Sequence, residues 1–140
     1  MKIQTSRFGE LEISEEKILD FTSGIPGFSE LTKFTVIEYK DPISWMQSTE
    51  NPEVAFIISN PFDLFSNYSI KLGDEALKFL DIKDESEALV FVILSVSDDV
   101  LTANLRAPLV VNTRSRKATQ LIVDDEKLLF KTPVNTINKK

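Results

Sequence analysis

The sequence predicts an all-β domain, mainly antiparallel, that forms a small barrel-like fold with one short capping helix. Two observations favour this fold class: short runs of alternating or β-branched residues recur along the chain, and prolines or glycines separate them. A third is that only one segment shows the spacing of an amphipathic helix. The 140 residues suffice for a single domain, which we expect to span residues 1–134. The polar residues 135–140 are expected to form a disordered tail.

The first half of the chain divides into strands at its turn residues. Residues 7–9 (Arg-Phe-Gly) separate two alternating runs and predict a hairpin in which glycine supplies the turn. Residues 24–28 (Gly-Ile-Pro-Gly-Phe) predict a rigid turn, and the Asx-Pro pairs at 41–42 and 51–52 favour turns over helix. Between these turns, strands are expected over residues 2–6, 10–13, 18–21, 34–39, 43–48 and 54–59.

The second half contains the expected helix and the expected central strand. Residues 74–80 predict a helix with Asp74 as its N-cap and with Leu77 and Leu80 on one face. Residues 88–96 are β-branched and aromatic, which predicts a central strand buried on both faces. Further strands are expected over residues 101–105, 109–112 and 119–123.

The composition excludes several kinds of functional site. The chain has no cysteine and no histidine, which excludes Cys/His zinc sites and the usual nucleophilic triads. We therefore expect no metal, no cofactor and no enzymatic activity. The net charge of −6 is not that of a generic nucleic-acid-binding protein. No signal peptide and no apolar run of membrane-spanning length is present, so we expect a cytoplasmic protein that binds neither nucleic acid nor membrane directly.

Acidic residues are concentrated in one part of the chain. Residues 72–101 carry eight acidic residues and two lysines, so this segment accounts for the whole net charge of −6. Its densest group is Asp84, Glu85 and Glu87, just before the expected central strand, and we expect this group to face a partner. The alternative is a solvated acidic surface that keeps the protein soluble.

Two other segments hold candidate contact residues. Trp45 and Gln47 lie on one expected strand. A single tryptophan on a strand usually packs in the core, but the polar residues beside it also fit a strand that faces a partner. Phe62, Phe65 and Tyr68 lie in a loop-like stretch. Two of these aromatic side chains would anchor the loop, and an exposed one would mark a contact surface.

The most specific pattern lies at residues 102–112, which read Thr-x-Asn-Leu-x-Ala-Pro-Leu-x-Val-Asn. This string resembles the signature of the FliW family of flagellar assembly factors. Shorter motifs agree with that family in order and spacing: Thr5, Phe8-Gly9-Glu10, Phe21, Gly24-Ile25-Pro26-Gly27-Phe28, Trp45-Met46-Gln47-Ser48, Pro52, Ala55-Phe56, Asn60-Pro61, Tyr68 and Gln120. The resemblance covers about residues 3–133. Within the string, Asn104 is expected to bond to nearby backbone or, alternatively, to contact a partner.

The resemblance implies a bacterial regulator without enzymatic activity. Proteins of the FliW family bind CsrA, an RNA-binding translational repressor, and relieve its block on flagellin mRNA. They also bind newly made flagellin, so that free flagellin withdraws the antagonist in a partner switch. The resemblance further implies a small antiparallel β-barrel with a helical cap. We expect the free protein to be monomeric.

Both implied partners can be given candidate contact residues. Unassembled flagellin would offer amphipathic helices, and residues 62–68 and 43–48 are the candidates to receive one through apolar contacts. The acidic group would oppose the repressor's hold on RNA by repelling phosphate, over a range of about 8 Å at physiological salt.

Two other function classes stay open from the sequence. A carboxylate-only enzyme would need two carboxylates in one cleft at a suitable separation. A direct RNA-binding barrel would need aromatic and basic residues interleaved on one face of its sheet. The aromatic strands expected at 34–39 and 54–59 carry almost no Lys or Arg.

Overall fold

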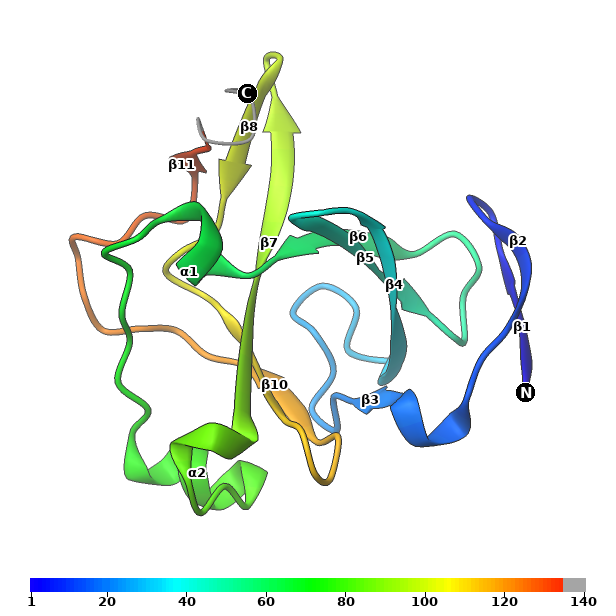
Figure 1. Ribbon diagram of the computed structural model, residues 1–140, viewed down its shortest axis with the longest axis horizontal. Coiled ribbons are helices and arrows are strands. Elements are labelled where there is room, and N and C mark those ends of the chain that lie inside the picture. Colours follow the sequence, from blue (N-terminus) through cyan, green and yellow to red (C-terminus); the bar gives the residue numbers. More distant parts are fainter. Residues whose placement is uncertain (135–140) are drawn as a thin grey trace.

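The computed structural model describes residues 1–134 and confirms the mainly antiparallel β-fold with its short helix (Figure 1). The tail expected at residues 135–140 lies outside the described residues. The strands are β1 (Lys2–Thr5), β2 (Gly9–Glu12), β3 (Leu19–Asp20), β4 (Lys33–Lys40), β5 (Ile43–Ser48), β6 (Ala55–Ser59), β7 (Ala88–Ser97), β8 (Val100–Ala103), β9 (Leu109–Asn112), β10 (Ala118–Gln120) and β11 (Thr132–Pro133). The helices are α1 (Pro61–Leu64) and α2 (Asp74–Leu80), with 3-10 turns η1 (Glu15–Lys17) and η2 (Glu85–Glu87).

Most of the strands form one antiparallel sheet that curls into a barrel. Its hydrogen-bonded order is β10-β9-β7-β6-β5-β4-β3, while β8 pairs with the outer part of β7 and β11 pairs with β8. The two end strands meet at a single parallel bridge between Asp20 and Lys117, where the Asp20 amide donates to the Arg116 carbonyl (2.8 Å). The barrel is therefore closed by one short seam. Strands β1 and β2 form a separate hairpin at one side (Figure 1).

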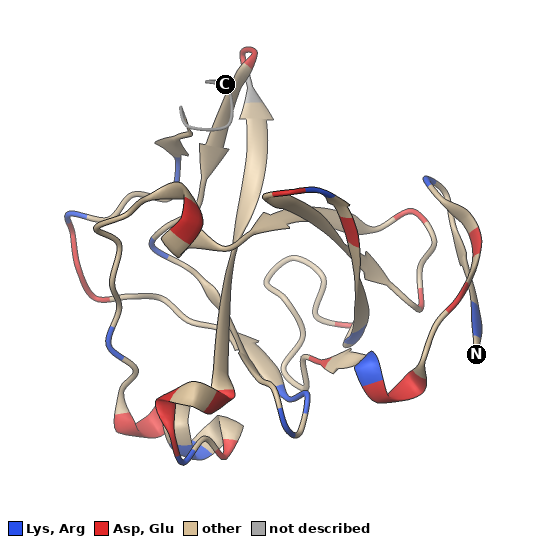
Figure 2. Ribbon diagram, viewed as in Figure 1, with Lys and Arg blue, Asp and Glu red and all other residues tan. Residues whose placement is uncertain are grey.

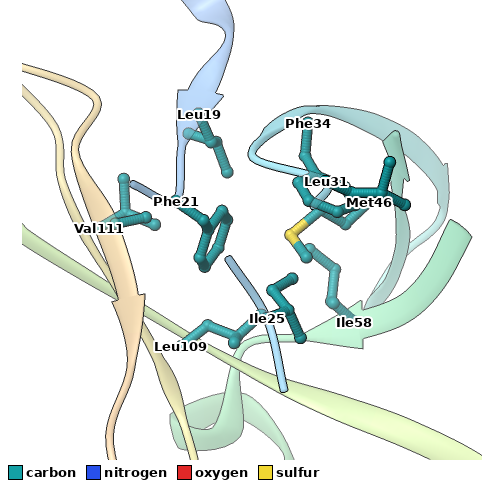
Figure 3. Packing of buried hydrophobic residues seen from close by; sticks show 10 residues of the cluster. Leu19, Phe21, Ile25, Leu31, Phe34, Met46, Ile58, Leu109 and Val111 are labelled. Atoms are coloured by element: carbon teal, nitrogen blue, oxygen red, sulfur yellow. The ribbon is translucent and has the colours of Figure 1, made fainter. Parts of the chain in front are cut away.

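The main hydrophobic core fills the interior of this barrel (Figure 3). Phe21 and Phe34 are fully buried, with ring centroids 5.6 Å apart, and Met46 on β5 packs in the same cluster. Successive side chains of a strand point to opposite faces, so Trp45 lies on the outer face of β5. Ile25 reaches this core from the loop between β3 and β4 and lies near Leu109 and Ile58 (Figure 3).

The loop that carries Ile25 folds back tightly at Gly24. This glycine has a φ of +73°, and an added Cβ would lie 2.6 Å from both the Cα and the carbonyl oxygen of Ser29. The expected rigid turn is present here, and it places an apolar side chain in the core rather than only reversing the chain.

The helical elements differ from expectation in two respects. The N-cap of α2 is Gly73 and not Asp74, because the Leu77 amide donates to the Gly73 carbonyl (3.1 Å) and the helix begins at the next residue. In addition, the stretch expected to be a loop contains the single turn α1, which starts at Pro61. The Asn60 side chain caps this turn by accepting from the Phe62 amide (2.8 Å).

Strand β7 was expected to be buried on both faces, and this is wrong for its C-terminal end. Val92 and Leu94 are buried, but Val96 is 65% exposed. The reason is that β7 and β8 project from the barrel as a hairpin (Figure 1). Asp98 and Asp99 form the tip of this hairpin, both with positive φ, as a two-residue turn of this kind requires.

Strand β10 ends earlier than the expected 119–123. Its partner strand continues into Pro108, which has no amide hydrogen and so interrupts the ladder. Leu121 and Val123 still donate to the carbonyls of Pro108 (2.9 Å) and Arg106 (2.8 Å), so the extended course of the chain goes beyond the strand.

Candidate partner-binding surface

A groove lies where α1, α2 and η2 come together over the start of β7. Its volume is about 400 Å³, and we call it the Phe62 groove. The side chains that line it are mostly apolar: Phe62, Ile70, Leu72, Leu77, Ala88 and Val90, with Lys71 and Glu85 as the charged members. The structure therefore brings together two residues predicted from separate segments, one aromatic and one acidic.

The segment that forms one wall of this groove was not singled out from the sequence. Residues 69–72, which we call the strap, connect the region of α1 to α2 and make no backbone–backbone hydrogen bond to the described residues. The strap is held by Ile70 and Leu72, which pack on the core cluster of Leu80 and Val90. The alternation of apolar residues at 70 and 72 was the available signal, although it was too short to interpret alone.

Among the three predicted aromatic residues, Phe62 is the exposed one. Its side chain is 45% exposed, and its ring lies 5.6 Å from that of Tyr68. Tyr68 is buried, its hydroxyl donates to the Leu105 carbonyl (2.8 Å), and this burial raises its pKa to about 12. Phe65 is half-buried against the same cluster. Tyr68 and Phe65 therefore anchor the loop, and Phe62 is the side chain that can contact a partner.

The three predicted acidic residues have different roles in the structure. Asp84 caps η2 by accepting from the Ser86 amide (3.3 Å), and it is exposed. Glu87 accepts from the Lys83 amide (2.9 Å) and pairs with Arg114, Nε to Oε2 being 3.3 Å. These bonds to its ionised carboxylate hold the pKa of Glu87 below its usual value, the Lys83 amide contributing most. Glu85 is exposed, and it lines the groove.

We expect Glu87 to contribute to stability at neutral pH and to lose this contribution in acid. Because its folded-state pKa lies below the ordinary 4.5, the contribution is present above that value and is lost as the pH falls through the folded-state pKa. Glu87→Gln should lower the urea midpoint at neutral pH and reduce the difference between neutral pH and about pH 3. Glu85→Gln, at an exposed carboxylate that forms no ion pair with the described residues, is the control and should leave the urea midpoint at neutral pH unchanged. Equal acid sensitivity of Glu87→Gln and the wild type would contradict this assignment.

Acidic residues are concentrated around α2 and η2, at the side of the molecule opposite the β1–β2 hairpin (Figure 2). Asp74 and Glu75 lie in the first turn of α2, and Asp81 follows its last turn. The acidic segment identified in the sequence is thus a surface feature next to the Phe62 groove, except for the pair at the tip of the β7–β8 hairpin.

Trp45 and Gln47 lie apart from the Phe62 groove, on the outer face of β5. The β1–β2 hairpin covers Trp45, with the Arg7 guanidinium 4.4 Å from its ring centroid and the Phe8 ring 6.1 Å away. Gln47 is buried, and its side-chain amide donates to the carbonyls of Pro52 and Val54 (both 3.2 Å). Both side chains therefore hold local structure together in this structure.

Asn104 lies between β8 and β9, and it too bonds to backbone. Its Oδ1 accepts from the Ala107 amide (3.0 Å), and the residue is half-buried. Asn104→Ala should cost about 1 kcal/mol in the free energy of unfolding, as for one hydrogen bond lost near the surface, and should leave partner binding intact. Urea denaturation measures the first and calorimetric titration the second. Unchanged stability with lost partner binding would show that Asn104 is instead a contact residue.

Comparison with known proteins places this chain in one family. A family model described as FliW protein matches residues 2–134. The flagellar assembly factor FliW of Thermosipho africanus is 42% identical over 136 residues, which cover 94% of this chain and 93% of that protein. The corresponding protein of Alkaliphilus metalliredigens is 41% identical over 131 residues, covering 90% and 81%. The chain belongs to the FliW family. A crystal structure of the flagellar assembly factor FliW superimposes with a TM-score of 0.89 at 37% identity, covering 95% of this chain and 96% of that one.

Family membership confirms the resemblance seen at residues 102–112. The FliW relatives are named as assembly factors and not as enzymes. Among residues 1–134, no helix is long and apolar enough to cross a membrane. Within the same range, no group of three or more His, Cys, Asp or Glu side chains is arranged to hold a metal ion.

One groove of this FliW-family chain does contain several carboxylates. Glu38, Asp41 and Asp63 line a hollow of about 380 Å³ beside Tyr39. A carboxylate-only enzyme needs at least two carboxylates in one cleft, and this hollow has three, but all three are exposed. Such enzymes set two carboxyl groups apart by enclosing one of them in an apolar environment, and this hollow supplies no such enclosure.

On the strands considered above, two of the three aromatic side chains are unavailable for stacking on RNA bases, and the third, Tyr39 at the end of β4, is 58% exposed beside Lys40. Phe34 is fully buried and Phe56 is half-buried, with their rings 6.0 Å apart in the barrel core. Bases stack on aromatic side chains that are open to solvent. These two rings are occupied by core packing instead.

Proposed function

We propose that this FliW-family chain is a cytoplasmic regulator of flagellin synthesis that acts by binding and not by catalysis. It binds a CsrA-type RNA-binding repressor and relieves repression of flagellin mRNA. It also binds flagellin, which withdraws it from the repressor in a partner switch. The observation that carries this proposal is the likeness to flagellar assembly factors over nearly the whole chain. The Phe62 groove adds a binding surface of suitable chemistry.

The Phe62 groove suits an amphipathic helix of flagellin. Such a helix docks through apolar side chains at helical spacing, and it needs a groove with apolar walls. Phe62, Leu72 and Leu77 supply such walls, Phe62 being exposed and the two leucines half-buried. The other candidate surface, the outer face of β5, is covered by the β1–β2 hairpin at Trp45. The Phe62 groove is therefore the better site for flagellin.

The acidic residues around α2 and η2 suit the antagonism toward the repressor. A protein that holds RNA gains much of its affinity from neutralising phosphates, so negative charges brought close to the RNA path weaken that hold. At physiological salt this repulsion acts over about 8 Å, so only the acids nearest the docked repressor contribute. Glu85 is exposed and forms no ion pair with the described residues, whereas Glu87 is paired with Arg114. Glu85 and Asp84 are the members of the group that can act in this way.

Binding experiments with both partners test the proposal. Purified protein is titrated into the repressor bound to flagellin mRNA, and flagellin is then added. Phe62→Ser should reduce flagellin binding by about tenfold or more, because one apolar anchor of the groove is lost. Glu85→Lys should reduce RNA release, with a defect that shrinks as salt rises. Circular dichroism checks that each variant keeps its fold.

Matched controls lie elsewhere on the surface. Phe130→Ser removes a phenylalanine of similar exposure, 49% against 45%, and Glu53→Lys makes the same charge change at an exposed loop position. Both should behave as the wild type. A wild-type protein that bound neither partner would refute the function, whereas normal binding by Phe62→Ser and Glu85→Lys would refute only the assigned surface.

A further inference from the structure

The outer edge of β10 and the residues after it carry backbone groups that no residue among 1–134 pairs with. On the inner edge, Leu121 and Val123 donate to the carbonyls of Pro108 and Arg106, and Thr119 pairs with Val110. In an antiparallel ladder, alternate residues turn their N–H and C=O groups away from the partner strand. Gln120 and Ile122 therefore direct theirs to the outer edge.

No described segment pairs with that outer edge beyond the barrel seam. Strand β3 meets it only at the bridge between Asp20 and Lys117, and the chain then turns away toward Gly24. Within residues 1–134, the backbone N–H and C=O groups of Gln120 and Ile122 have no hydrogen-bond partner on this side. The side chain of Ile122 is 67% exposed. Natural proteins usually protect such edges, because they are templates for pairing with another chain.

A second groove runs along this edge, between residues 119–124 and α2, and we call it the β10 groove. Its volume is about 520 Å³. Apolar side chains line it from both sides: Ile70, Leu72, Ala76, Phe79, Leu121, Ile122 and Val123. Phe79 is 39% exposed and Ile122 is 67% exposed, so the groove is open to solvent on both of its sides.

The rim of the β10 groove is acidic at one end. Glu75 on α2 and Asp124 on the facing segment both line the groove, and neither forms an ion pair with the described residues. Lys71 of the strap is the one basic residue among those that line it. Asp125 and Glu126 continue this charge along the chain. At the other end, the Lys117 ammonium lies 5.3 Å from the centroid of the Phe79 ring. A basic side chain of a ligand would thus be favoured near Glu75 and Asp124.

We propose that this edge binds an extended peptide segment of a partner protein, which adds to β10 as a further β-strand. The peptide backbone pairs with Gln120 and Ile122, its alternate apolar side chains enter the β10 groove, and a Lys or Arg lies near Glu75 and Asp124. A helix would satisfy its backbone internally and leave the edge unpaired, whereas an added strand uses both the edge and the groove. The inference does not depend on the proposed function, since it concerns a different groove on the other side of the strap.

Amide exchange measured by NMR tests the inference directly. The probe is a synthetic peptide of about nine residues with valine at alternate positions, threonine between them and lysine at its ends. Saturating peptide should slow hydrogen exchange at the amides of Gln120 and Ile122, because these form new hydrogen bonds. The amides of Leu121 and Val123 are already bonded and should change little. The same peptide N-methylated at the amides that would face the edge should bind at least about tenfold more weakly.

Variants of the protein separate the backbone from the charge contribution. Ile122→Pro removes a backbone N–H that forms no hydrogen bond to the described residues, so it should leave the melting temperature nearly unchanged. It should lower the affinity for the peptide about tenfold or more. Ile122→Val is its control and should bind normally. The double variant Glu75→Lys/Asp124→Lys should bind this peptide more weakly and should no longer prefer it to a peptide with glutamate at its ends. The double variant Glu10→Lys/Glu53→Lys, with both changes at the far side of the molecule, should bind it as the wild type does.

Three results would each overturn the inference. They are no binding of the peptide at millimolar concentration, unchanged exchange at Gln120 and Ile122 in its presence, and equal affinity of the N-methylated peptide. The last would mean that the groove holds apolar side chains in some other conformation. None of these measurements involves flagellin or the repressor. A negative result with the peptide therefore leaves the proposed function intact, and a negative result with flagellin or the repressor leaves the inference about the β10 edge intact.

Discussion

Asn112→Ala should lower the free energy of unfolding by about 3–5 kcal/mol, the largest loss that we expect from a single polar residue here. Asn112 is fully buried at the end of β9. Its side-chain amide donates to the carbonyls of Leu80 (2.7 Å) and Asp81 (3.1 Å), at the C-terminal end of α2. Its Oδ1 accepts from the amides of Arg114 (2.8 Å) and Ser115 (3.2 Å). The substitution removes the Asn112 partner of all four groups, of which the Asp81 carbonyl alone keeps another within residues 1–134, the Arg114 guanidinium (3.2 Å).

The loss should show in α2 as well as in global stability, because Asn112 joins this helix to the barrel. Chemical denaturation gives the free energy, and hydrogen exchange in α2 should rise in the variant. Asn112→Asp keeps an acceptor but loses the donors to the Leu80 and Asp81 carbonyls, so it should be nearly as destabilising. Thr113→Ala, at an exposed neighbour, is the control and should cost at most about 1 kcal/mol. Similar stabilities for all three variants would contradict the anchoring role.

Gly24→Ala should also be strongly destabilising, by about 3–5 kcal/mol. The φ of +73° is unfavourable for alanine, and the new methyl group would lie 2.6 Å from backbone atoms of Ser29, which cannot move aside as a flexible side chain would. Relief of this contact has to shift the loop that inserts Ile25 into the core.

Gly27→Ala is a matched control in the same turn. Gly27 has a φ of +88°, but an added Cβ would meet nothing within 4 Å. This variant should therefore show only the backbone cost of about 1–2 kcal/mol. Urea denaturation of both variants measures the difference, and equal losses would show that the close approach to Ser29 is not what requires glycine at position 24.

The strands could be predicted because the residues that form them carry the periodicity. The bounds of β5 and of α2 agree with the predicted 43–48 and 74–80. The single turn α1 was missed because four residues show no period, although a proline directly after Asn60 was a usable cue for a helix start. The exposed end of β7 was also missed, because the residue types of an apolar strand do not show whether other elements cover it.

The candidate site could be predicted in its members but not in its assembly. Phe62 and Glu85 were both among the predicted residues, but their shared groove depends on the path of the strap between them. Which acid is free also depends on tertiary structure, because Arg114 pairs with Glu87 from a strand connection far along the chain. The exposure of Phe62 and the burial of Tyr68 are likewise set by packing, and their residue types alone do not distinguish them.

The short seam of the barrel has a consequence for how the chain is made. Near this seam, the Arg116 guanidinium donates to the Glu16 carbonyl (3.2 Å), a contact between residues 100 positions apart. During synthesis, the N-terminal strands emerge long before the segment that closes the barrel over them. Contacts of such separation form slowly, because the loop-closure entropy is lost before the contacts are gained. The part of the core that Leu19 and Phe21 share with Leu109 and Val111 therefore cannot form until most of the protein has been translated, and the nascent chain is most exposed to aggregation during this interval.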